Sequence, residues 1–155
     1  MEILEQRKLD NTMTVTVYDQ SKKMVGDRWL IKIICEAELP VDEEFFARIP
    51  EADLALQAEV RQVMGGSVTF SATKERTFVA ESERVALVES MVTEIMTNMV
   101  AYLNKAEFPE RLFARKYGEF REACATARHY RSLEAAECDG EADEGPADFS
   151  ACFKD

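Results

Sequence analysis

Residues 82–103 have the sequence SERVALVESMVTEIMTNMVAYL, in which apolar side chains recur at alternating steps of three and four. This spacing lines up one apolar stripe along a helix. Ser82 is a suitable N-cap, and Glu81 and Glu83 lie near the positive end of the helix dipole. The pattern predicts one long packed helix, whose stripe consists of Val85, Val88, Val92, Ile95, Met99 and Tyr102.

A second stripe with helical spacing follows in residues 108–127. Its members are Phe113, Tyr117, Phe120, Cys124 and Ala127. Pro109 stands near the start of this segment, where proline is favoured in helices. Because only a few residues separate the two helices, we expect them to pack antiparallel as a long helical hairpin.

Strand patterns precede the helices. Residues 12–20 and 29–39 alternate apolar and polar side chains, as half-buried strands do. We expect them to pair as an antiparallel hairpin, with Gly26 in the connection at a positive backbone φ. Residues 67–80 predict either one further strand or a second hairpin broken at Lys74-Glu75.

These elements together predict an α+β fold. We expect an antiparallel sheet of three to four strands, with one face covered by helices that include the long helical hairpin. A further helix is expected in residues 50–64, with Pro50 at its start and Gly65-Gly66 as its stop. Residues 1–131 are predicted to form the single domain. Residues 132–155 carry eight carboxylates and one lysine and predict an acidic, flexible tail.

Composition limits the classes of function. The chain has 155 residues, of which 46% are hydrophobic and 32% charged. It contains no apolar run of the roughly 20 residues needed to span a bilayer, and no signal-peptide pattern at its start. We therefore expect a soluble, cytoplasmic protein that does not engage membranes. The net charge of −11 and the absence of a long basic run argue against nucleic-acid binding.

No motif for catalysis, a cofactor or a metal is present, and we predict none of these sites. The four cysteines lack the close spacing of zinc ligands, and His129 is the only histidine. An acid-base enzyme using His129 and an unidentified carboxylate is the third of three interpretations.

The leading interpretation is a non-catalytic protein-interaction or regulatory domain. Arg111, Arg115, Gly118 and Glu122 lie on one side of the second helix, opposite its apolar stripe. A glycine in a helix interior loses roughly 1 kcal/mol relative to alanine, so Gly118 indicates a close approach by another group. This face could receive the acidic tail or another protein, or it could be an ordinary solvated surface. We expect a protein partner or a homodimer, bound through a helical face or a sheet edge.

The second interpretation is a binding module for a small apolar ligand. Its pocket would lie between the sheet and the helices. The residues expected to line it are Trp29, Phe70, Phe78 and Met96.

Overall fold

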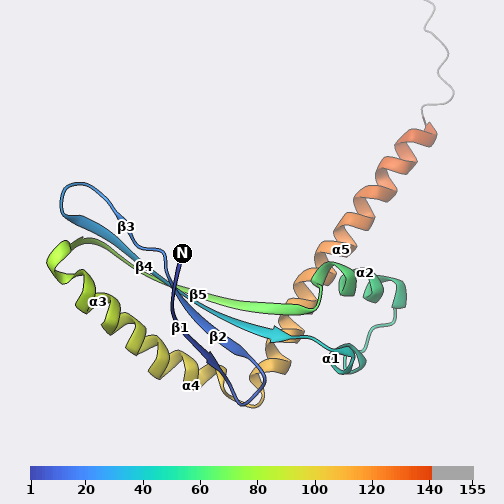
Figure 1. The fold of residues 1–155 in the computed structure, drawn as a ribbon. Coiled ribbons are helices and arrows are strands. Elements are labelled where there is room, and N and C mark those ends of the chain that lie inside the picture. The colour runs from blue at the N-terminus through green and yellow to red at the C-terminus, as the bar shows by residue number, and fades with distance from the viewer. Residues whose placement is uncertain (141–155) are drawn as a thin grey trace, which may run out of the picture.

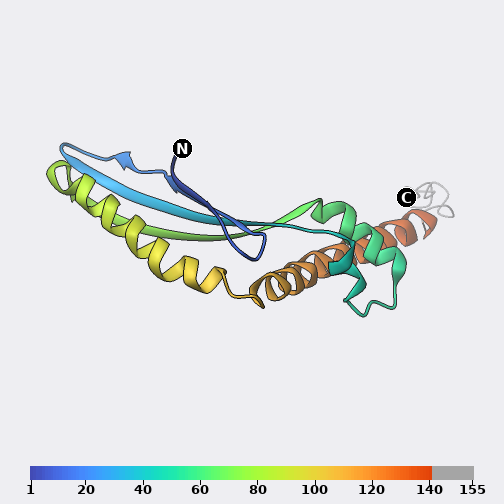
Figure 2. The ribbon, with the colours of Figure 1, turned by 60° about the horizontal axis from the view of Figure 1, so that its bottom comes forward.

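The computed structural model describes residues 1–140, which form an elongated molecule. A long curled sheet occupies one end, and α5, the longest helix, extends away from the other (Figures 1 and 2). The chain combines helices with a sheet whose strand pairings are all antiparallel, so the predicted α+β class is confirmed.

The sheet has five strands, rather than the predicted three to four. They are β1 (Glu2–Lys8), β2 (Thr14–Asp19), β3 (Lys22–Lys23), β4 (Arg28–Pro40) and β5 (Ser67–Ala80). The central strand is β4, because β2 and β3 pair with one of its edges and β5 with the other. β1 extends the sheet beyond β2, and every pairing is antiparallel.

The expected hairpin of β2 and β4 is confirmed. Val15 pairs with Ala37 and Val17 with Cys35, and all four side chains are buried. Gly26 in the connection has a φ of 65°, as predicted. β5 is one continuous strand along β4 and not a second hairpin. β1 was not predicted, because its mixed charges hide the alternation that identifies a strand.

The predicted long helix forms as α3 (Glu81–Glu94), a π-helical turn η1 (Ile95–Met99) and α4 (Val100–Leu103). It runs along β4 and β5 (Figure 2). Its buried residues are Met91, Ile95, Val100 and Leu103. The step of five from Ile95 to Val100 crosses the π turn, which inserts a residue and rotates the buried face. Tyr102, which follows the π turn, is therefore exposed. Val85, in the first turns of α3, is exposed as well.

Two shorter helices connect β4 to β5. Asp42 caps α1 (Glu43–Ala47), and Asp53 caps α2 (Leu54–Met64) by accepting a hydrogen bond from the backbone N–H of Leu56. α2 thus starts later than the Pro50 predicted from sequence. It ends at Gly65, whose φ of 76° stops the helix as expected.

The last helix, α5 (Phe108–Gly140), has 33 residues and packs mainly against α2. Its Phe113 ring lies 5.1 Å from Phe45 and 5.2 Å from Phe46, between ring centroids. Phe113, Tyr117 and Cys124 are buried as predicted. Their partners, however, are α1 and α2.

The long helical hairpin and the packing of all helices on one face of the sheet are not confirmed. α5 leaves α4 at an angle and packs beyond the end of the sheet where β4 ends and β5 begins (Figure 1). It also continues through Gly140, past the predicted domain boundary at residue 131. The rest of the predicted tail, residues 141–155, lies outside the described residues.

Candidate functional site

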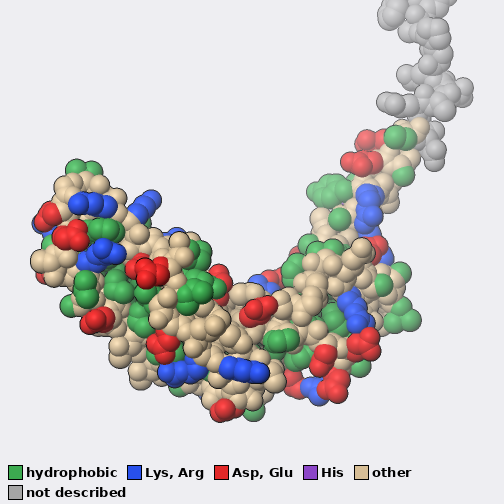
Figure 3. Space-filling view, viewed as in Figure 1, with side chains coloured by type: hydrophobic (Ala, Val, Ile, Leu, Met, Phe, Trp, Pro, Cys, Tyr) green, Lys and Arg blue, Asp and Glu red, His purple; other side chains and the backbone are tan. Residues whose placement is uncertain are grey.

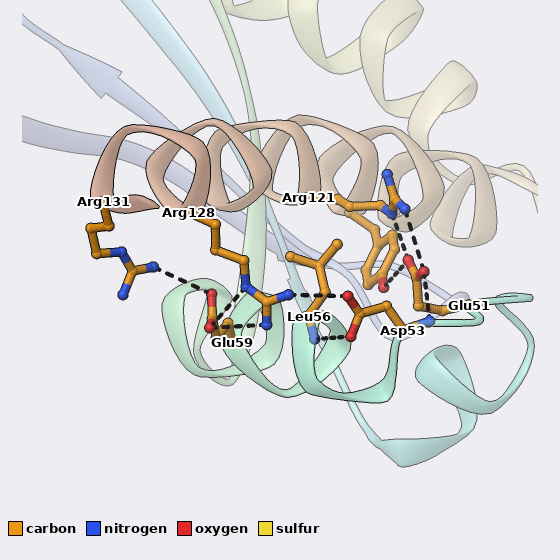
Figure 4. Close-up of polar contacts among 8 residues, drawn as sticks. Glu51, Asp53, Leu56, Glu59, Arg121, Arg128 and Arg131 are labelled. Atoms are coloured by element: carbon orange, nitrogen blue, oxygen red, sulfur yellow. Dashed lines mark hydrogen bonds and ion pairs between the residues drawn. The ribbon is translucent and has the colours of Figure 1, made fainter. Parts of the chain in front are cut away.

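A row of ion pairs fixes the inner face of α5 to the segment that begins α2 (Figure 4). Glu51 receives a hydrogen bond from Arg121 Nε at 2.5 Å and another from the Tyr117 hydroxyl at 3.2 Å. Arg128 donates to Asp53 at 3.0 Å and, through two nitrogens, to Glu59 at 3.0 and 3.1 Å. These contacts fix how α5 is rotated about its own axis.

The same contacts hold the acidic groups in their charged form. The hydrogen bond from Arg121, followed by that from the backbone N–H of Asp53, lowers the pKa of Glu51 to about 2. The backbone N–H of Leu56, and then Arg128, lower the pKa of Asp53. Because Glu51 and Asp53 are each paired with an arginine and also accept a backbone N–H, and Glu59 is paired with Arg128, this row of ion pairs is a structural clamp.

The contact face predicted from sequence lies on the side of α5 opposite these ion pairs. We call this side, from Arg111 to Glu137, the outer face of α5. Arg111, Arg115, Gly118 and Glu122 are all exposed. Within the chain, Arg115 pairs with Glu119 at 3.2 Å, a contact one helical turn away. A Cβ built on Gly118 would meet no heavy atom within 4 Å. No group of the described chain approaches Gly118 closely, so the close approach inferred from sequence is not found within residues 1–140.

The outer face of α5 also carries a shallow groove that sequence analysis missed. It is lined by Glu119, Glu122, Ala123, Thr126, Ala127 and Tyr130. The Tyr130 side chain is 62% exposed, and Leu133, one turn further along, is 47% exposed. Figure 3 shows hydrophobic side chains among charged ones along the part of α5 that projects from the body. The spacing of Ala123, Thr126, Tyr130 and Leu133 was the available signal.

The outer face was found only in part from the sequence, because Ala127 was assigned to the buried stripe, whereas the structure exposes it. The first two turns are different: Phe108 and Leu112 on this side are buried, with the Phe108 ring near Phe70 and Tyr102. The outer face thus continues, with exposed side chains, the line along α5 that begins with the buried Phe108 and Leu112.

The structure does not bring the predicted ligand-pocket residues together. Trp29 lies at the start of β4, where its Nε1 donates to Glu81 at 2.5 Å. Phe78 is exposed at the end of β5 that pairs with the start of β4. Phe70 pairs with Ala37 at the opposite end of β4. Met96 is half-buried in η1.

Phe70 borders a hollow of about 100 Å³, shared with Arg111 and Arg115. Pockets for small molecules are usually roughly 300 to 1,000 Å³. This hollow is therefore a feature of the surface beside α5 and not a pocket for a ligand of that size.

The side chains that could act as a base, a nucleophile or a metal ligand lie apart from one another. His129 is exposed on α5, and its nearest aromatic contact is the Tyr130 ring, 6.1 Å between centroids. Burial, followed by the nearby Glu36 carboxylate, raises the pKa of the Cys35 thiol to about 11, which removes its nucleophilic form at neutral pH. Among the described residues, no group of three or more His, Cys, Asp and Glu side chains could hold a metal ion. Over the same residues, no helix is long and apolar enough to cross a bilayer.

No protein-family model, curated protein or solved structure matches this chain. The feature of the molecule that most favours a binding role is α5, since one side of this helix is paired with α2 and the other side is exposed.

Proposed function

We propose that this protein is a non-catalytic interaction or regulatory domain that binds another protein through the outer face of α5. One observation carries the proposal: a 33-residue helix is clamped to the body on its inner side, while its outer side carries an exposed apolar stripe. Exposed apolar stripes rimmed by charges are typical of surfaces that recognise a helix.

The length of α5 supports this proposal. The clamp contact nearest its C-terminal end is that of Arg131, whose guanidinium lies 3.8 Å from Glu59. Residues 132–138 continue the helix with every side chain exposed. Isolated helices shorter than roughly 12 to 15 residues are marginal in water, so this extension gains stability if a partner packs against it.

The β5 edge of the sheet is a less suitable surface. The outer strand β5 carries Lys74, Glu75 and Arg76 in its middle. Lys74 pairs with Glu94 of α3 at 2.6 Å, and Glu75 with Lys32 of β4 at 3.3 Å. Charged side chains on an edge strand discourage the addition of another strand. We therefore place binding on the helix.

A photo-crosslinking amino acid at Thr126 tests the proposal in living cells. We expect a discrete protein adduct, and binding of the identified protein, once purified, should weaken at least tenfold on Tyr130→Glu. The matched control is Val63, which is also exposed but lies on α2. The control should give no adduct, and Val63→Glu should leave binding unchanged. Equal labelling from both positions, or none from Thr126, contradicts the proposal.

A further inference from the structure

We propose that the occupant of the outer face of α5 is a second copy of this chain, with the two α5 helices antiparallel and a twofold axis near Thr126. This inference rests on the proposed function and names its partner. Three features support it: the distribution of charge along α5, the distance between its oppositely charged ends, and the small residues near the centre of the outer face.

Charge along the outer face reverses from one end to the other. Arg111 and Arg115 are exposed near its start, where each also pairs with a glutamate four residues away along the chain, and Glu134 and Glu137 are exposed near its end. A parallel pair of such helices would place like charges together. An antiparallel pair places the arginines of each copy beside the glutamates of the other, which is the self-complementary arrangement that a twofold axis requires.

The chain cannot make these pairs within itself. Arg115 and Glu137 lie on one helix, about 33 Å apart along its axis at 1.5 Å per residue. This pair therefore forms only between two copies.

The centre of the face suits a close crossing. With the axis at Thr126, Arg115 faces the partner's Glu137 and Glu122 faces the partner's Tyr130, whose hydroxyl is a donor for a carboxylate. Gly118 and Ala123 leave room for the approaching helix, which accounts for a glycine whose Cβ position is open within the chain. α2 lies on the inner side of α5, and the outer face from Arg115 onward is exposed at Gly118, Glu122, Thr126 and Tyr130.

The available area predicts a weak dimer. The helix from Arg115 to Gly140 is about 39 Å long. With a contact strip of roughly 10 Å, two copies bury about 800 Å² in total, below the standard size of stable interfaces. We therefore expect dissociation in the micromolar range, which makes the assembly concentration-dependent.

Sedimentation over a wide concentration range, with a charge swap, is the first test. Arg115→Glu and Glu137→Arg should each weaken dimerisation about fivefold or more. Each substitution is present in both copies and so removes both of the symmetry-related ion pairs. The double variant restores opposite charges at both contacts and should return the dissociation constant to within twofold of the original. Two single losses without rescue in the double variant contradict the antiparallel arrangement.

Crosslinking is the second test, and it fixes the position of the axis. In a background with Cys138→Ser and Cys152→Ser, Thr126→Cys should be joined to its symmetry mate by a short bismaleimide. Val63→Cys is the matched control and should not be joined. The remaining Cys35 and Cys124 are buried. A dimer that is crosslinked equally from both positions overturns the proposed interface.

The two proposals can fail separately. A chain that stays monomeric at several hundred micromolar, with no crosslink from Thr126→Cys, overturns the inference of a second copy. If the cellular photo-crosslink from Thr126 then identifies a different protein, the proposed interaction function stands. If no adduct forms in cells either, both are wrong.

Discussion

Truncating Phe113 to alanine should destabilise the protein strongly, because this side chain connects α5 to the body. Phe113 is 2% exposed, and its ring packs between Phe45 and Phe46. The change removes roughly 120 Å² of buried apolar surface, or about 3 kcal/mol at 25 cal/mol per Å². Lost aromatic contacts and the cavity bring the expected loss in unfolding free energy to about 4 kcal/mol.

Urea unfolding followed by circular dichroism measures this loss, at protein concentrations low enough to keep the chain monomeric. Tyr130→Ala is the matched control, because it removes an exposed aromatic from the outer face and should change the unfolding free energy by less than about 0.5 kcal/mol. If Phe113→Ala does not fold, Phe113→Leu should still fold with a loss of about 1 kcal/mol. Equal effects of Phe113→Ala and Tyr130→Ala would refute the distinction between a clamped and an open side of α5.

Three further outcomes follow from the structure. The folded pKa of Glu51 is about 2, below its ordinary 4.5, so its stabilising contribution is complete above pH 4.5 and is lost as pH falls toward 2. The difference in unfolding free energy between the native chain and Glu51→Gln should therefore shrink over that interval. Gly65→Ala should lose about 1 to 2 kcal/mol of unfolding free energy through its φ of 76°, whereas Gly66→Ala should be nearly neutral. Cys35 should react with a maleimide at least 100-fold more slowly in the folded chain than in urea, as mass spectrometry of timed samples would show, since its side chain is fully buried and its pKa rises from 9.0 to about 11.

Local patterns in the sequence predicted the elements whose partners are close along the chain. The β2 and β4 alternation identified both strands and their pairing, since each buries one face against the same core. Gly26 and Gly65 were predicted correctly because a positive φ is a local requirement. The α+β class followed from these elements.

The partner of each helix was not predictable in the same way. The buried stripe containing Phe113 and Tyr117 was identified, but an apolar stripe does not state which surface covers it. The phase of the stripe through Ile95 also changed, because a π turn has no reliable signature in one sequence. The outer face of α5 was found only in part: its charged residues were named, whereas Tyr130 and Leu133 were recognised only from their exposure.

Hydrogen exchange along α5, compared at low and high protein concentration, decides whether this helix binds a second copy. Amides in residues 119–138 should become better protected as the protein concentration rises, while the protection of amides in α2 should not change. Protection of residues 132–138 that is independent of concentration, and equal in Arg115→Glu, would contradict a binding surface for a second copy on this side of the helix.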